Sequence, residues 1–167
     1  RPPTVTVVSE MLRNGCFALD MNRGGGMATR YVDPERTLFA ELRKLPREHT
    51  VDMLNLVKLR RFAEYEDGRS ATGQEAYAAY GRESAPIFQS VGGKIIWSAE
   101  PEFMVIGPPD EMWDIAFVAR YPSAQAFFDM VYDPAYQSIV FHRQAAVETS
   151  RLVRTKARLD GDAKGFG

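Results

Sequence analysis

Four segments of the chain have hydrophobic patterns that predict strands. Residues 51–60 (VDMLNLVKLR) and 113–121 (WDIAFVARY) are apolar on both alternating faces, as expected for central strands that are covered on both sides. Residues 94–110, which are interrupted by Pro101, and residues 150–158, which have one polar face, are typical of edge strands. The four segments predict one sheet with two central and two edge strands.

Helix-terminal signals separate these strands. Asp33 as N-cap and Pro34 as the first helical residue predict a short leading helix that ends before Pro46. Residues 72–75 (TGQE) have the pattern of a capping box, in which the first and last side chains each accept a hydrogen bond from the other residue's backbone amide. The helix that they begin is predicted to end at the glycine pair 92–93, because glycine readily takes the left-handed conformation after a helix.

The helical segment before the last strand is predicted in two pieces. Ser123 caps the first piece, and Asp133 with Pro134 begins the second. The order is then β-α-β-β-α-β, which is typical of a ferredoxin-like α+β sheet with both helices on one face, here with an extra N-terminal helix. Leu54 and Leu56, or the residues that alternate with them, are expected on the face without helices. Because a bare apolar sheet face usually marks an interface, we expect two sheets to pack face to face as a dimeric α+β barrel.

Three segments carry a resemblance to a known family: residues 53–60 (MLNLVKLR), residues 72–81 (TGQEAYAAYG) and residues 91–153, which run from VGGK to SRLV. In order and spacing they resemble an uncharacterised family of small bacterial proteins, a domain of unknown function within the dimeric α+β barrel superfamily. The resemblance extends over residues 31–155 and implies the fold and a homodimer. It implies no reaction, because the family that it resembles is itself functionally unassigned. The wider superfamily includes cofactor-free monooxygenases, muconolactone-type isomerases, dehydratases and haem-dependent enzymes, and a shared fold does not transfer any one of these activities.

The first 26 residues differ in character from the rest of the chain. They end in a triple glycine before Met27 and lack the basic start and long apolar core of a secretory signal. We expect residues 1–26 to be an extension outside the folded core. The alternative is that this N-terminal segment packs on a partner subunit. Residues 27–167, in a chain with 45% apolar residues, are expected to form a single domain.

Charge and cysteine content exclude several classes of partner. The chain has 21 basic and 22 acidic residues with no dense basic block, so we expect no nucleic-acid partner. No apolar run reaches the length of a membrane span, so we expect no membrane partner. The single cysteine, Cys16, cannot form a disulfide within the chain, which favours a reducing, cytoplasmic location. Two histidines, His49 and His142, are too few for a zinc site, and we expect neither a metal nor a cofactor.

A ligand pocket is predicted between the sheet and the two helices, because apolar clefts with a few polar groups are the usual ligand sites. His142 is displaced by about 100° from the centre of the apolar stripe of its helix, and imidazole exchanges protons near neutral pH. His142 is therefore the candidate catalytic acid or base, and Asp114 at a strand start is the candidate group that orients it. The alternatives are a solvent-facing histidine and a turn cap. The candidate ligand-binding residues are Asn55, Tyr77, Tyr80, Trp113 and Arg143.

Each ligand-binding candidate also has a structural explanation. Tyr77 and Tyr80 belong to a helix stripe that is core in any case, and packing explains Trp113. An amide in an apolar strand needs hydrogen-bond partners, so Asn55 either ties the backbone together or faces a polar pocket. Arg143, near the centre of its stripe, either forms an internal ion pair or anchors a ligand carboxylate.

Two functions of different classes follow from these candidates. The first is a cofactor-independent enzyme, isomerase-like or monooxygenase-like, that transfers a proton on a small apolar or carboxylated metabolite. The second is a non-catalytic dimeric ligand-binding or accessory module whose polar residues serve the fold.

Overall fold

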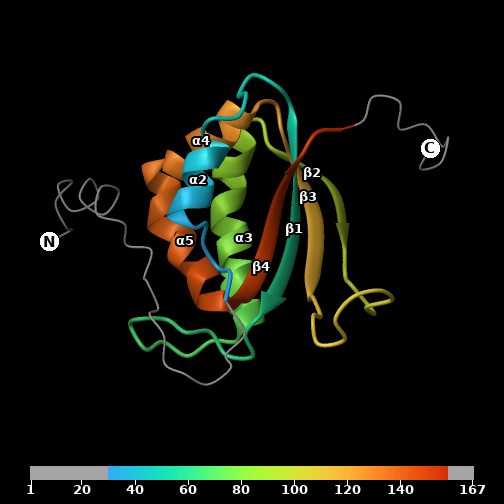
Figure 1. The fold of residues 1–167 in the computed structure, drawn as a ribbon. Helices are drawn as coiled ribbons and strands as arrows, with labels where there is room; N and C mark the ends of the chain where they lie inside the picture. Colours follow the sequence, from blue (N-terminus) through green and yellow to red (C-terminus); the bar gives the residue numbers. More distant parts are fainter. Residues whose placement is uncertain (1–29, 158–167) are drawn as a thin grey trace, which may run out of the picture. The chain divides into compact units, whose positions relative to one another are not determined.

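The computed structural model describes residues 30–157, in which four antiparallel strands form a sheet with helices on one face (Figure 1). Along the chain the elements of this sheet and its helices are β1 (Val51–Leu59), α3 (Gly73–Ser90), β2 (Lys94–Ala99), β3 (Ile115–Tyr121), α4 (Ala124–Tyr132), α5 (Pro134–Ala146) and β4 (Val147–Thr155). The predicted α+β class and antiparallel sheet are confirmed. The strand order β2-β3-β1-β4 places β1 and β3 in the centre, as predicted. Residues 33–45, which contain α2 (Arg36–Leu42), form a separate compact unit, and the predicted extension of residues 1–26 lies outside the described residues.

The start of the leading helix differs from its prediction. The N-cap of α2 is Glu35, and the predicted cap, Asp33, lies outside the helix. The physical reason is found just upstream, where the Tyr31 carbonyl accepts a hydrogen bond from the Ser150 amide of β4 at 2.7 Å. This pairing holds the chain beside β4 up to residue 31, so that the chain must turn before a helix can begin.

The predicted caps of the other helices are confirmed. Thr72 accepts a hydrogen bond from the Glu75 amide at 3.1 Å, and the Glu75 carboxylate accepts one from the Thr72 amide at 2.8 Å. The side chains of Ser123 and Asp133 accept hydrogen bonds from backbone amides at the starts of α4 and α5. These four side chains satisfy amides that have no partner within their own helices.

The second strand is shorter than its prediction. β2 ends at Ala99, and residues 100–114 form a loop to β3. Pro101 accounts for the early end, because a proline has no amide hydrogen to donate to the strand ladder.

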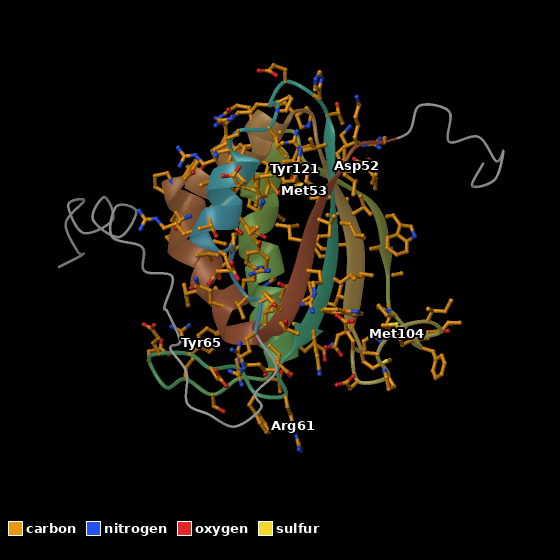
Figure 2. All side chains as sticks on the ribbon, viewed as in Figure 1. Asp52, Met53, Arg61, Tyr65, Met104 and Tyr121 are labelled. Atoms are coloured by element: carbon orange, nitrogen blue, oxygen red, sulfur yellow. The ribbon has the colours of Figure 1, made fainter. Side chains whose placement is uncertain are left out.

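Alternate residues of the two central strands face the helices and form the core. The register places Val51 opposite Tyr121 and Met53 opposite Ala119, and all four are buried. Figure 2 shows Met53 and Tyr121 on the side of the sheet that the helices cover. Phe128 of α4 is the largest of the fully buried side chains. The helix-facing layer of β1 is thus the odd-numbered set, which also includes Asn55.

The even-numbered residues of β1 lie on the opposite side of the sheet, which α3, α4 and α5 leave uncovered and which we call the open face (Figure 1). Leu54 and Leu56 are half-buried there, as predicted. One apolar row crosses all four strands and consists of Trp97, Val118, Leu54 and Val153. Trp97 and Val153 are 51% and 48% exposed, so this row is accessible at both edges of the sheet.

Both ends of the open face are charged. At one end Arg120 donates two hydrogen bonds of 2.7 Å to the carboxylate of Asp52, its cross-strand neighbour. Hydrogen bonding from Arg120 lowers the pKa of Asp52 below its ordinary value. Lys94 lies opposite Arg120 on β2. At the other end Arg151 donates to Glu111 at 3.0 Å. The apolar middle of the open face is therefore framed by ion pairs.

No loop separates α5 from β4, and Arg60 covers the joint. The last carbonyls of a helix have no donor within the helix. The Arg60 guanidinium donates to the carbonyls of Gln144, at 2.9 Å, and Val147, and its backbone amide donates to the Ala146 carbonyl at 2.8 Å. Arg60, which is the residue after β1, thus supplies the missing donors at the C-terminal end of α5.

Candidate functional site

His142 lies in a seam between α3 and α5, where it is almost completely buried. Its exposed fraction is 7%. The Tyr65 hydroxyl lies 2.6 Å from Nδ1, and a Glu83 carboxylate oxygen lies 3.4 Å from Nε2. With the ring proton on Nε2, the Tyr65 hydroxyl can donate to Nδ1, and Nε2 lies within ion-pair distance of the Glu83 carboxylate. The three side chains thus form a row of phenol, imidazole and carboxylate, which we call the Tyr65–His142–Glu83 path.

Tyr65 is held in this seam by the long loop between β1 and α3. The loop closes on itself, since Phe62 and Thr72 form an isolated bridge and the Ala63 amide donates to the Ala71 carbonyl at 2.9 Å. Burial raises the pKa of the Tyr65 hydroxyl above its ordinary value. The phenol therefore keeps its proton near neutral pH and can donate it to His142.

A cation covers the aromatic side of the seam. The Arg69 guanidinium lies 4.8 Å from the centre of the Tyr65 ring and 5.5 Å from that of Phe141. Asp67 accepts hydrogen bonds from Arg69, which lower the pKa of the Asp67 carboxyl. The Phe141 ring lies 4.1 Å from the His142 ring. These contacts fix the orientation of both rings of the Tyr65–His142–Glu83 path and place a positive charge beside the phenol.

Asp114 is placed away from this seam. Its carboxylate accepts a hydrogen bond from the Leu59 amide at 2.6 Å, and its own amide donates to the Val57 carbonyl at 2.9 Å. These bonds join the start of β3 to the end of β1. The polar groups beside His142 are Tyr65 and Glu83, and the structure does not bring Asp114 to them.

Trp113 belongs to the charged end of the open face. It is buried, and the Arg151 guanidinium lies 5.1 Å from its ring centre and 4.8 Å from that of Tyr31. Trp113 and Tyr31 therefore lie against the same guanidinium, and neither is part of the His142 seam.

Tyr77 and Tyr80 gather with Tyr136 and Arg143 in the interior between α3 and α5. The Tyr80 and Tyr136 hydroxyls are 2.9 Å apart, and the Tyr77 and Tyr80 ring centres are 5.6 Å apart. Burial raises the pKa of Tyr77 to about 12 and also raises that of Tyr136. Arg143 donates to the Val32 carbonyl and, at 3.0 Å, to the Ser150 hydroxyl. This cluster is a layer of phenol side chains with Arg143 at its border.

The Asn55 side chain forms a hydrogen bond with the backbone of its own strand. Its side-chain amide donates to the Met53 carbonyl at 2.9 Å, and the residue is half-buried on the helix-facing side of the sheet. Of the two alternatives for this amide, the backbone tie is the one that the structure contains.

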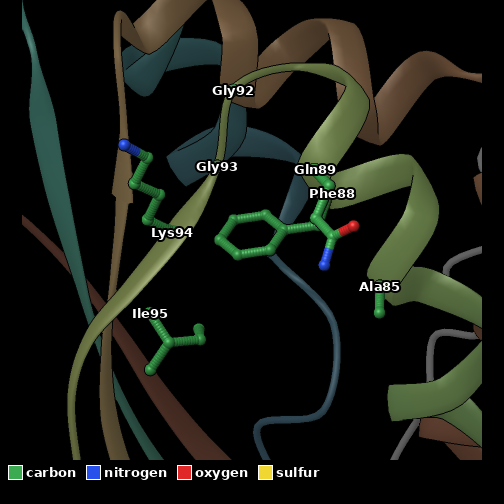
Figure 3. A pocket seen from close by; sticks show the side chains of 7 residues that line it. All are labelled: Ala85, Phe88, Gln89, Gly92, Gly93, Lys94 and Ile95. Atoms are coloured by element: carbon green, nitrogen blue, oxygen red, sulfur yellow. The ribbon is translucent and has the colours of Figure 1, made fainter.

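An open hollow of about 460 Å³ lies between the end of α3 and the start of β2, and Figure 3 shows the side chains around it. Its lining residues are Ala85, Phe88, Gln89, Gly92, Gly93, Lys94 and Ile95. The candidate residues predicted from the sequence lie elsewhere. Among residues 30–157, no group of three or more His, Cys, Asp or Glu side chains could hold a metal ion.

Sequence reasoning identified His142 but missed Tyr65, Glu83 and Arg69. These residues lie in a charged loop and on an exposed helix position, where neither hydrophobic period distinguishes one polar residue from another. A sequence signal for Tyr65 does exist, since it is an aromatic residue within the charged run "RFAEYEDGR". Its contact with His142 spans 77 positions of the chain and follows only from the fold.

One family model matches the chain. Residues 69–155 match a family described as "Domain of unknown function (DUF1330)". Two crystal structures of the RPA0582 protein, which is of unknown function and comes from Rhodopseudomonas palustris, are 52% identical to this chain. They give TM-scores of 0.77 and 0.75, cover 80% and 78% of this chain, and are themselves covered to 99% and 98%.

A third structure is a dimeric protein of unknown function with a ferredoxin-like fold from Bacteroides fragilis. It is 15% identical and has a TM-score of 0.42. The aligned region spans 65% of this chain and 96% of the Bacteroides protein. No protein of curated function matches the sequence. The family match over residues 69–155 and the 52% identity to RPA0582 lead to one conclusion: the chain belongs to the DUF1330 family of domains of unknown function.

Proposed function

We propose that this protein is a cofactor-independent enzyme that transfers a proton on a small apolar or carboxylated metabolite. The observation that carries the proposal is the Tyr65–His142–Glu83 path, in which both nitrogens of a buried imidazole have a partner. An imidazole between a phenol and a carboxylate is a common arrangement for general acid–base chemistry, because the carboxylate fixes the tautomer and stabilises the charged ring.

The proton balance of the step is simple. The Tyr65 oxygen accepts a proton from an acidic C–H or O–H bond of the substrate while its own hydroxyl proton passes to His142 Nδ1. The products are a substrate anion and an imidazolium ion, and the Glu83 carboxylate stabilises the imidazolium through Nε2. The Arg69 guanidinium, 4.8 Å from the centre of the Tyr65 ring, favours negative charge on the phenol oxygen during the transfer. The reverse sequence returns a proton to a different atom of the substrate, which is an isomerisation.

Exchange of substrate protons with deuterated water tests this proposal without knowledge of the natural substrate. Small carboxylates, lactones and phenols are incubated with the protein in D₂O, and proton NMR follows the loss of signal at acidic positions. We expect Tyr65→Phe and His142→Gln to slow the exchange by about 100-fold or more, the usual contribution of a positioned acid or base. Tyr132→Phe, at an exposed position of α4, is the matched control and should leave exchange unchanged.

Equal exchange rates in the wild-type protein and in Tyr65→Phe would remove the proposed role of the seam. Saturable binding of a compound without any exchange would instead favour a non-catalytic ligand-binding or accessory module.

We further propose that the protein acts as a homodimer whose open faces pack together. The support is the apolar row of Trp97, Val118, Leu54 and Val153, since monomeric proteins rarely leave a continuous apolar sheet surface in water. Leu54→Asp places a charge in the middle of this row. Sedimentation at micromolar concentration should then change from a dimer for the wild-type protein to a monomer for Leu54→Asp, with the helical circular dichroism retained.

A further inference from the structure

The loop between β2 and β3 carries the most exposed large apolar side chains of the described residues. We call residues 100–112 the arm. Phe103, Val105 and Ile106 are 80%, 83% and 91% exposed. The arm is folded on itself, since a Cβ atom at Gly107 would lie 2.6 Å from the Met104 sulfur. Met104 therefore fills the inside of the turn, and its neighbours point outward.

The arm stands out from the sheet on the side away from the helices. Figure 1 shows the loop between β2 and β3 projecting beyond the open face, and Figure 2 shows Met104 on that side. A second molecule packed on the open face would have this arm beside it. An isolated chain, in contrast, gains nothing from holding Phe103 and Ile106 in water.

The hollow lined by Phe88, Lys94 and Ile95 lies at the opposite end of β2. Six residues of strand separate the two features, or roughly 20 Å at 3.3 Å per residue. The arm of one chain is thus remote from the hollow of the same chain. Consider two copies whose open faces pack together, related by a two-fold axis that lies between the sheets and runs perpendicular to the strands. Rotation about this axis reverses the direction of every strand. It brings β2 over β2 and the arm of each chain to the hollow of the other.

We propose that the arm of each protomer occupies the hollow of a second copy of this chain. The inference rests on the homodimer proposed above and adds where its second contact is made. Phe103 and Ile106 are the apolar side chains that enter the hollow, against Phe88 and Ile95.

The area of the open face supports a second contact. Four strands at about 4.8 Å spacing, each about seven residues long at 3.3 Å per residue, give a flat face of roughly 450 Å². A stable dimer buries about 800 Å² on each partner. The exposed apolar side chains of the arm are further surface that such a dimer can bury.

Charge is complementary between the same two features. The arm contains no basic residue and four acidic ones: Glu111 pairs with Arg151 of its own chain, and the others are Glu100, Glu102 and Asp110. The hollow has Lys94 at its rim, and Arg120 lies opposite Lys94 on β3. An acidic arm is therefore attracted to the cations at this end of the sheet.

Dilution series in the analytical ultracentrifuge test whether the arm contributes to the dimer. We expect Phe103→Ser combined with Ile106→Ser to raise the dimer Kd at least 100-fold. Phe62→Ser, at a position 62% exposed in another loop, is the control and should leave Kd unchanged. An unchanged Kd in the arm variant would overturn the proposal. Because all three side chains are exposed, the variants should fold, and circular dichroism checks this.

Disulfide trapping tests where the arm binds. In a Cys16→Ser background, Gln89→Cys with Ile106→Cys should give a covalent dimer under mild oxidation, and neither single cysteine variant should do so. A disulfide within one chain is excluded because the Cα atoms would have to approach within about 7 Å. Absence of the covalent dimer, with sedimentation still showing a dimer, would overturn the arm contact and leave the open-face dimer standing. A dimeric Leu54→Asp variant would overturn both, and the proton-exchange assay decides the enzymatic proposal separately.

Discussion

Alanine in place of Gly81 and of Gly93 should change the free energy of unfolding in opposite directions. Gly81 lies inside α3 on its exposed side, and a Cβ atom there would meet no other atom within 4 Å. Alanine restricts the unfolded chain and favours the helix, so Gly81→Ala should stabilise the protein by about 0.5 to 1 kcal/mol.

Gly93 lies against an aromatic ring. A Cβ atom at Gly93 would lie 2.1 Å from the ring of Phe88, which packs edge to face on Tyr121 with 5.2 Å between ring centres. The ring must swing away, which forfeits an aromatic contact of about 0.5 to 1.5 kcal/mol and adds overpacking strain of about 1 to 3 kcal/mol. Gly93→Ala should therefore destabilise the protein by about 2 kcal/mol or more.

Urea unfolding at one fixed protein concentration measures both variants, since association would otherwise shift the apparent stability. The Phe88→Ala background supplies a double-mutant cycle: without the ring, Gly93→Ala should cost almost nothing. The reasoning would be refuted by a Gly93→Ala protein as stable as Gly81→Ala, or by a cost that persists in full when Phe88 is absent.

Three further outcomes follow from individual contacts. Because the pKa of Asp52 is lowered in the folded state, the stability from its pair with Arg120 is present above pH 4 or so and is lost as pH falls through the lower folded pKa; Asp52→Asn should flatten this part of the acid-unfolding profile. Asn55→Leu removes the bond to the Met53 carbonyl and should lower the free energy of unfolding by about 1 kcal/mol; a more stable variant would show that the amide costs the fold. Thr72→Ala should cost about 1 kcal/mol in thermal unfolding through loss of the α3 cap, whereas Thr72→Ser should retain most of it.

Local chemistry made much of the fold predictable from the sequence. The capping box at Thr72 and the Asp133–Pro134 start depend on residues within one helical turn, so they are visible without tertiary information. The apolar residues on both faces of residues 51–60 predicted a central strand, and β1 does pair with β3 on one side and with β4 on the other. Asp33 failed as a cap for a tertiary reason, since the preceding residues pair with β4.

The candidate site was less accessible to sequence reasoning. His142 stood out because few side chains titrate near neutral pH, but its partners come from a loop and from a neighbouring helix. Helical periodicity placed Tyr77 and Tyr80 on one stripe correctly, yet it could not show that their partner is Tyr136 of α5. Proximity of distant residues is set by the packing of α3 on α5, and a single sequence does not encode that packing in any local period.

The hydrogen bonds of Arg60 couple the local unfolding of α5 to that of β1. The Arg60 guanidinium and amide donate hydrogen bonds to the last carbonyls of α5. The end of α5 can therefore unfold only after these hydrogen bonds from Arg60 have broken. The end of α5, the start of β4 and the end of β1 should therefore open as one cooperative unit in native-state hydrogen exchange, with shared protection of their amides. Arg60→Met would keep the aliphatic stem, remove the cap, and let the last turn of α5 exchange earlier than the strands on either side of it.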